Sequence, residues 1–114
     1  MKKKIIIAMV AATILTVMYV QIKAMISPPR ADSPESIART FCVNECNRAK
    51  DSGQDISNSP CISNNIAPDW VCDVAHNPRQ AVDNLPENQC SAFREGRAHH
   101  FVEVDETCGL IRAV

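Results

Sequence analysis

The sequence contains few of the residues from which active-site loops and large cores are built. Only three of its 114 residues are glycine, and only five are Phe, Trp or Tyr. It has neither a glycine-rich phosphate-binding loop nor a nucleophilic serine in an elbow motif. A chain of this length is too short for a barrel or a dinucleotide-binding enzyme. We therefore expect one small domain that holds no cofactor.

Basic residues are scarce in most of the chain. No lysine follows Lys50, and residues 27–114 carry eight basic residues against thirteen acidic ones. With histidine neutral, this segment has a net charge of −5, whereas the whole chain has −1. Nucleic-acid binding requires clustered lysine and arginine side chains that neutralise phosphates. The sequence therefore predicts no nucleic-acid partner.

The other basic residues flank or interrupt an apolar N-terminal segment. Residues 2–4 are lysine, residues 5–20 are uncharged and mostly apolar, and Gln21 and Lys23 follow. A membrane span needs about 20 apolar residues, so this run is short for a span and at the long edge of the apolar core of a signal peptide. Snorkelling of Lys23 and helix tilt allow residues 5–26 to enter the membrane. We predict that residues 1–26 form an uncleaved signal anchor, with a cleaved signal peptide as the alternative.

This interpretation divides the chain into three parts. After the N-terminal segment, residues 27–33 are predicted to be a linker and residues 34–114 an extracytoplasmic domain. Positive charge at the N-terminus favours a cytoplasmic location for that end. The expected location is the cell membrane, or outside the cell if the segment is cleaved. The expected partners are the membrane, through residues 5–26, and an extracytoplasmic protein.

All the cysteines follow the export segment. An even number of cysteines in a short extracytoplasmic domain predicts three disulfides, which also compensate for a small core. A structural zinc site usually has two closely spaced ligand pairs, and only one such pair is present here, so we predict no metal site. The six cysteines are Cys42, Cys46, Cys61, Cys72, Cys90 and Cys108.

Six cysteines allow 15 pairings, and the sequence does not select among them. On a helix, Cys42 and Cys46 lie one turn apart on the same face, so each is expected to bond with a cysteine elsewhere. The pairing that we predict is Cys46–Cys61, Cys42–Cys90 and Cys72–Cys108.

The clearest predicted element is a helix from residue 34 to residue 52. Asp32 or Ser33 can cap its N-terminus, Pro34 is tolerated in the first turn, and Gly53 can end it in a left-handed conformation. The other predicted elements are an irregular loop at 54–68, a strand at 69–75, a long loop at 76–89, a hairpin made of 89–94 and 97–104, and a strand at 110–114. This order predicts an α+β fold, with one helix packed on a three- or four-stranded antiparallel sheet.

Alternation within the predicted strand 69–75 assigns its side chains to two faces. Trp70, Cys72 and Val74 are expected on one face, and Val71, Asp73 and Ala75 on the other. The aromatic residues expected in the core are Phe41, Trp70, Phe93 and Phe101.

The loop at 76–89 is the predicted binding surface. It is long and polar, and Cys72 and Cys90 flank it, so its ends are expected to be rigid. Alternatively, its Asn and Asp side chains cap the loop's own backbone, which would make it a structural Ω-loop. The candidate binding residues are Asn77, Arg79, Asp83 and Asn84.

Histidine and carboxylate residues suggest two weaker hypotheses. On a strand, His99 and His100 point to opposite faces, which leaves His99 beside Glu103 as a pH-sensitive or weak metal-binding pair, or as part of a solvated face. Asp73, His76 and Asp105 can form an acid–base site if their strands pair. No motif requires such a site, so an enzyme is the less favoured prediction.

The sequence therefore predicts a membrane-anchored extracytoplasmic module with a binding or envelope-structural role. The alternative is a small secreted hydrolase or metal-dependent enzyme that uses Asp73, His76 and Asp105.

Overall fold

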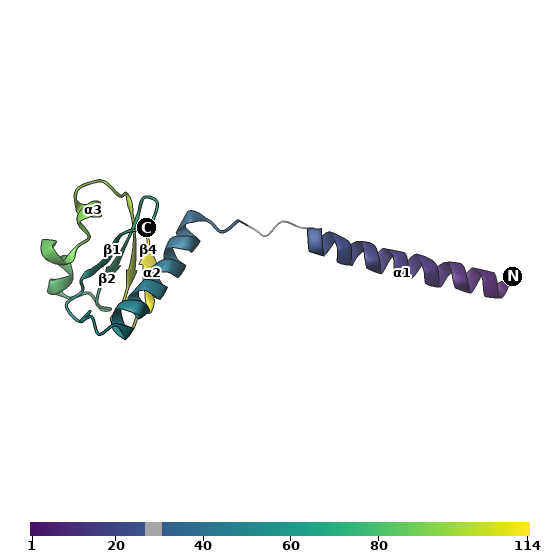
Figure 1. Cartoon of the computed structure of the whole chain (residues 1–114), viewed down its shortest axis with the longest axis horizontal. Coiled ribbons are helices and arrows are strands. Elements are labelled where there is room, and N and C mark those ends of the chain that lie inside the picture. The colour runs from purple at the N-terminus through teal and green to yellow at the C-terminus, as the bar shows by residue number, and fades with distance from the viewer. Residues whose placement is uncertain (27–30) are drawn as a thin grey trace. The chain divides into compact units, whose positions relative to one another are not determined.

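The computed structural model describes residues 1–26 and 31–114 (Figure 1). The chain separates into two compact units, Met1–Ala31 and Asp32–Val114, and each is described here by itself. Part of the predicted linker 27–33, namely residues 27–30, lies outside the described residues.

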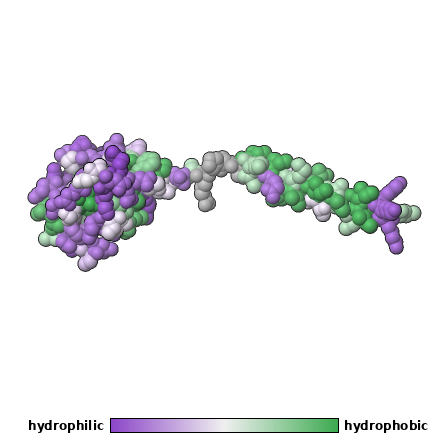
Figure 2. Space-filling model, turned by 60° about the horizontal axis from the view of Figure 1, so that its bottom comes forward, coloured by the Kyte–Doolittle hydropathy of each residue, from purple (hydrophilic) through white to green (hydrophobic). Residues whose placement is uncertain are grey.

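The first unit is the helix α1, Lys2–Ile26. It continues through Gln21 and Lys23, so at about 1.5 Å per residue its 25 residues extend about 37 Å. That length exceeds the roughly 30 Å thickness of a bilayer's hydrocarbon core. None of its residues is buried, and Figure 2 shows hydrophobic side chains along most of its surface. By length and composition the helix can cross a membrane, and a signal sequence meets the same criteria.

The helix α2, Pro34–Asp51, confirms the clearest sequence prediction. The Ser33 hydroxyl accepts a hydrogen bond from the Ser36 backbone N–H at 3.1 Å and so caps the N-terminus. Beyond the other end, Gly53 has φ +84°, the left-handed region in which glycine is favoured. The buried residues of α2 recur at every fourth position along one face, and they are Ala38, Cys42 and Cys46.

The second unit contains a four-stranded sheet with the order β1-β2-β3-β4. Its strands are β1 (Cys61–Ala67), β2 (Trp70–Val74), β3 (His100–Val104) and β4 (Leu110–Ala113). The β1–β2 and β3–β4 pairs are antiparallel, whereas β2 and β3 are parallel. The α+β class is therefore confirmed, but the sheet is mixed and not wholly antiparallel as expected.

A parallel pair requires a crossover, and residues 75–99 provide it. This segment contains two 3₁₀ turns, η1 (Ala81–Asn84) and η2 (Pro86–Asn88), and the single-turn helix α3 (Ser91–Arg94). The predicted hairpin over 89–104 is therefore wrong. Residues 91–94 are helical, and β3 pairs with the more distant β2.

The predicted loop at 54–68 is also wrong over much of its length, because β1 occupies Cys61–Ala67. Its centre is the polar run Ser63-Asn64-Asn65, which obscures the apolar–polar alternation of a strand. The pairing with β2 has two register irregularities, as is common in edge strands. The Asn64 side chain also accepts a hydrogen bond from the Ala92 backbone N–H at 2.8 Å, which ties β1 to α3.

The helix α2 packs against all four strands on one face of the sheet (Figure 1). From β2, Trp70, Cys72 and Val74 enter this core, and from β3 Val102 and Val104 do so. The alternation predicted for β2 is thus confirmed.

The opposite face is covered only in part, by a smaller cluster next to α3. It contains Val71, Cys90, Ala92 and Ala98, with Phe101 packed against it. We call this side of the sheet the open face.

Three disulfides form and no cysteine is free, which confirms the predicted number. The bonded pairs are Cys42–Cys72, Cys46–Cys108 and Cys61–Cys90. All three predicted pairings are therefore wrong. Cys42 and Cys46 connect α2 to β2 and to the turn between β3 and β4. Cys61 begins β1 and bonds to Cys90 before α3, because the segment expected to be a loop belongs to the sheet.

The expected aromatic core is smaller than predicted. Trp70 is buried, whereas the exposed fractions of Phe41 and Phe93 are 51% and 40%. Phe93 and Phe101 instead form an edge-to-face pair on the open face, with their ring centroids 5.1 Å apart. Apolar packing against α2 is therefore supplied mainly by valine, cysteine and Trp70.

Candidate functional site

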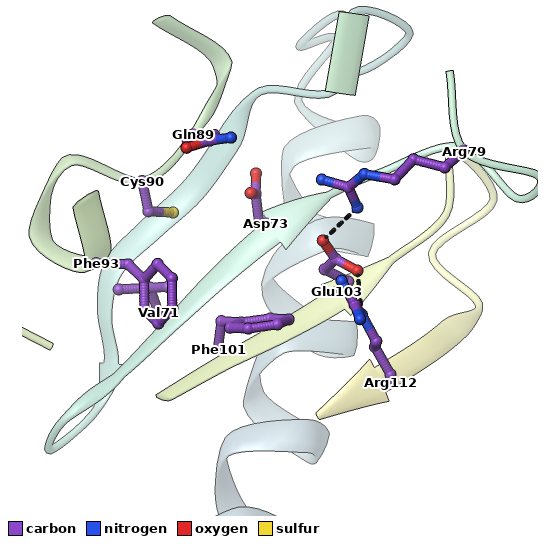
Figure 3. Close-up of a pocket in the computed structure, with 9 residues that line it drawn as sticks. All are labelled: Val71, Asp73, Arg79, Gln89, Cys90, Phe93, Phe101, Glu103 and Arg112. Atoms are coloured by element: carbon purple, nitrogen blue, oxygen red, sulfur yellow. Dashed lines mark hydrogen bonds and ion pairs between the residues drawn. The ribbon is translucent and has the colours of Figure 1, made fainter. Parts of the chain in front are cut away.

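A pocket of about 180 Å³ lies on the open face of the sheet (Figure 3). Strands β2, β3 and β4 form one part of its wall, and the crossover between β2 and β3 forms the other. The lining residues are Val71, Asp73, Arg79, Gln89, Cys90, Phe93, Phe101, Glu103 and Arg112.

Glu103 holds two arginines at one side of the pocket. Its carboxylate accepts one hydrogen bond from Arg79 Nη1 at 2.8 Å and another from Arg112 Nε at 2.7 Å (Figure 3). Burial by itself raises the pKa of Glu103, but the bonds from Arg112 and Arg79 lower it by more, so the pKa lies below its usual value. The two guanidinium cations are therefore held in place by their hydrogen bonds to one carboxylate anion.

Asp73 is the partner of Glu103 in the β2–β3 register, so the two carboxyl groups lie on neighbouring strands of the same face. Burial, and then the like charge of Glu103, raise the pKa of Asp73 to about 8. Among the described residues, its buried Oδ1 atom has no hydrogen-bond partner. At neutral pH a carboxyl group with this pKa keeps its proton, and within the described residues one oxygen of Asp73 is left without a hydrogen bond.

The remaining wall of the pocket is mainly apolar. Val71 is 1% exposed, and the edge-to-face pair Phe93–Phe101 lies beside it. The Arg112 guanidinium lies over the Phe101 ring, 5.1 Å from its centroid. The Cys61–Cys90 disulfide connects β1 to the chain just before α3, so it fixes this wall covalently.

The four candidate residues of the predicted binding loop have different surroundings. Arg79 lines the pocket and also donates to the Asn84 side chain through Nε at 2.9 Å. Asp83 is 3% exposed and accepts a bond from the Gln80 backbone N–H at 2.7 Å, so it caps the loop's own backbone. Asn77 is exposed and precedes a cis proline. Only Arg79 therefore belongs to the pocket.

Asp83 is also the centre of a small polar cluster with Ser59 and His76. Its Oδ1 accepts from the Ser59 hydroxyl and lies 2.8 Å from His76 Nδ1, while Oδ2 accepts from the His76 backbone N–H at 3.1 Å. Burial raises the pKa of Asp83, but the bond from the Gln80 backbone and those from Ser59 and His76 lower it well below its usual value.

This cluster contains the residue types of a catalytic triad without the required arrangement. In a triad the serine and the carboxylate contact opposite nitrogens of the histidine ring. Here the Ser59 hydroxyl lies 3.0 Å from His76 Nδ1, the same nitrogen that faces Asp83. Ser59 is also 1% exposed. The arrangement serves to fix the crossover to the segment before β1.

The predicted acid–base group is not assembled. In the described part of the chain, no hydrogen bond joins any two of Asp73, His76 and Asp105. Asp73 lines the pocket, and His76 contacts Ser59 and Asp83. Asp105 accepts from the backbone N–H groups of residues 107 and 109 within the turn before β4.

The predicted pair of His99 and Glu103 is not formed either. His99 Nδ1 lies 2.7 Å from the Asp69 carboxylate, and this bond from His99 lowers the pKa of Asp69. His100 stacks on Trp70, with the ring centroids 4.6 Å apart. Within residues 1–26 and 31–114, no group of three or more His, Cys, Asp or Glu side chains is arranged to hold a metal ion.

Most of the pocket was not predictable from local patterns in the sequence. Gln89, Phe101, Glu103 and Arg112 come from three separate segments, and the parallel pairing of β2 with β3 brings them together. One signal was present, because alternation placed Val71 and Asp73 on the same face of their strand.

The fold and the disulfides define a coarse class. The three disulfides and the N-terminal apolar helix are consistent with an extracellular disulfide-rich module, in a membrane or secreted location. Comparison with protein-family models, with curated proteins and with solved structures gave no match for the chain.

Proposed function

We propose that this protein is a membrane-anchored extracytoplasmic binding module whose ligand site is the pocket on the open face. The observation that carries the proposal is the buried Oδ1 of Asp73, which has no partner among the described residues. A buried polar atom left without a hydrogen bond costs about 1–3 kcal/mol. Asp73 lines the pocket, so a small rotation of its carboxyl group lets a ligand bond to this atom and recover that free energy, which gives the position a functional reason to hold a carboxyl group.

The walls of the pocket support a binding role because they are held in place before any ligand arrives. Glu103 fixes Arg79 and Arg112 by hydrogen bonds, and the Cys61–Cys90 disulfide fixes the opposite side. A rigid site loses little conformational entropy on binding. With apolar residues at its base and a few convergent polar groups, the pocket has the usual composition of a small-molecule site.

Anchoring is the second part of the proposal. The continuous helix α1 is long enough to span a bilayer, and the three disulfides are typical of oxidising compartments outside the cytoplasm. Intact mass of the protein isolated from its native membrane tests this part. A mass that includes residues 1–26 supports an anchor. A mass that lacks them, with the protein in the medium, shows a secreted module instead.

Binding is tested with the full-length protein in lipid nanodiscs by protein-observed NMR. The probes are single-ring compounds that carry an anionic, a cationic or a neutral group. We expect at least one of them to cause saturable shift changes at the pocket residues Val71, Gln89 and Phe101. If no compound does so, the pocket is not a small-molecule site and the proposal is rejected.

A matched pair of variants controls for nonspecific binding. Gln89→Trp places a bulky side chain at the pocket, whereas Gln54→Trp makes the same change at an exposed glutamine after α2. We expect Gln89→Trp to abolish the shift changes and Gln54→Trp to leave them unchanged. Equal binding by both variants would place the ligand elsewhere.

A further inference from the structure

The charges that face the pocket indicate the kind of ligand it accepts. Besides Asp73 on β2, the ionisable side chains in its lining are Glu103 on β3, Arg112 on β4 and Arg79 from the crossover. Asp83, also in the crossover, adds a more distant negative charge that acts on Asp73. With Asp73 protonated, the lining therefore carries two guanidinium cations against the single carboxylate of Glu103, a net charge of +1.

Hydrogen-bond donors in this lining remain available. In the part of the chain that the structure describes, Arg112 uses only its Nε atom, in the bond to Glu103, so its two terminal nitrogens make no protein hydrogen bond. Arg79 by contrast donates from all three nitrogens, to Asn84, Glu103 and the Asp83 backbone carbonyl. A protonated Asp73 adds one O–H donor. Arg112 and Asp73 are thus the two groups that can donate to an acceptor on a ligand.

The space available limits the ligand's size. A cavity of about 150 Å³ lined by apolar side chains accommodates benzene. The pocket measures about 180 Å³, and Val71, Phe93 and Phe101 form its apolar wall. It therefore accepts roughly one six-membered ring with one small polar substituent.

We propose that the pocket binds a small organic monocarboxylate, whose ring-sized apolar part packs on Val71, Phe93 and Phe101 and whose carboxylate accepts hydrogen bonds from Asp73 and Arg112. The negative charge of such a ligand neutralises the net +1 of the lining. A ring-bearing ammonium is disfavoured, because it would add a second positive charge unless Asp73 lost its proton. This inference rests on the proposed function and specifies the ligand class for the same site.

The two ligand classes have opposite pH dependence. A carboxylate requires Asp73 to keep its proton, and burial with the charge of Glu103 raises the pKa of Asp73 to about 8. Carboxylate affinity should therefore fall roughly tenfold between about pH 6 and about pH 9. An ammonium ligand prefers ionised Asp73, so its affinity should rise over the same interval.

The experiment uses ligand-observed fluorine NMR with full-length protein in nanodiscs. The probes are para-fluorobenzoate, para-fluorobenzylamine and para-fluorobenzyl alcohol, which share one ring and differ in charge. We expect saturable binding of the benzoate that weakens above about pH 8 and little binding of the amine or the alcohol. In Asp73→Asn, whose amide still donates, benzoate binding should persist without this pH dependence. The control Asp51→Asn, at the exposed end of α2, should behave like the unmodified protein.

The possible failures are distinguishable. If the amine binds and its affinity rises with pH, or if the alcohol binds as well as the benzoate, the ligand class is wrong and the binding site stands. Pocket binding of the benzoate that is the same at all pH values in the unmodified protein also overturns the role of Asp73. If no probe binds, or if Gln89→Trp binds all of them unchanged, both the inference and the proposed function fail.

Discussion

Replacing Asp73 by asparagine should stabilise the folded domain at neutral and alkaline pH. The pKa of this carboxyl group is raised from 3.8 to about 8 on folding, first by burial and then by Glu103. Between these two values the unfolded chain has lost a proton that the folded chain still holds. The folded state therefore loses stability as pH rises through this interval, whereas below about pH 3.8 the group has no effect.

The magnitude follows from the width of that interval. At about 1.4 kcal/mol per pH unit, the difference between the unfolded pKa of 3.8 and the folded pKa of about 8 limits the effect. The ionisation of Asp73 can therefore lower the free energy of unfolding by at most about 6 kcal/mol. Because the carboxyl group borders a pocket that admits water, we expect about half of this, roughly 3 kcal/mol, at pH 8. Near pH 3 the stability of Asp73→Asn should equal that of the unmodified protein within about 0.5 kcal/mol.

The measurement is urea denaturation of the oxidised full-length protein in detergent micelles, followed by the fluorescence of Trp70. Trp70 is the only tryptophan and is buried against α2, so its emission reports folding and not events at the pocket. Asp51→Asn serves as the control for an exposed aspartate. The reasoning is refuted if Asp73→Asn is destabilising at pH 8, or if its effect does not change between pH 3 and pH 8.

Three further predictions concern the groups around the pocket and the covalent framework. Asp83→Asn should destabilise the domain by about 3 kcal/mol at neutral pH, because a buried charged acceptor loses its bonds. Since folding lowers the pKa of Asp83, this cost should shrink in acid below about pH 4, which urea titration at several pH values measures. Glu103→Gln should lower the pKa of Asp73, because a like charge is removed and the two arginines are released. Carboxyl-carbon NMR titration detects this shift, and an unchanged pKa would contradict the role assigned to Glu103. Removing Cys46–Cys108 by paired alanine substitutions should lower the free energy of unfolding by about 4 kcal/mol, roughly 0.7 kcal/mol more than removing Cys61–Cys90. The reason is that the Cys46–Cys108 bond closes a loop of 62 residues, whereas the Cys61–Cys90 bond closes one of 29. If the two disulfide variants have equal urea midpoints, or if the variant without Cys46–Cys108 has the higher one, native packing and not loop length sets the difference.

Local features of the fold were predictable from the sequence, and the long-range pairings were not. The cap of α2 and its end at Gly53 depend on residues within one turn of each boundary, so the sequence predicted both. The faces of β2 follow from alternation within five residues. The parallel pairing of β2 with β3 depends instead on where a 25-residue crossover returns, which no local pattern encodes.

The disulfide pairing failed for the same reason. Two cysteines bond only if their Cα atoms come within about 7 Å, so pairing is a consequence of topology. Because the sequence predicts a loop at residues 61–67, it pairs Cys61 with Cys46 of the helix and Cys90 with Cys42, and neither pair forms. The pocket was not predictable for the same reason, because only the order of the strands brings Glu103 and Arg112 close to Asp73.

The position of the Cys46–Cys108 bond determines how the domain responds to mechanical load. If tension is applied between Ser33 and Val114, the shortest covalent path runs to Cys46, crosses to Cys108 and continues to the C-terminus. This path contains roughly 19 chain steps, so even a fully unfolded oxidised domain extends only about 70 Å, against about 290 Å once the bonds are reduced. Residues 47–107, including most of the pocket, lie off the loaded path. The oxidised domain therefore extends far less than the reduced one, and the load bypasses the face of the sheet that carries the pocket.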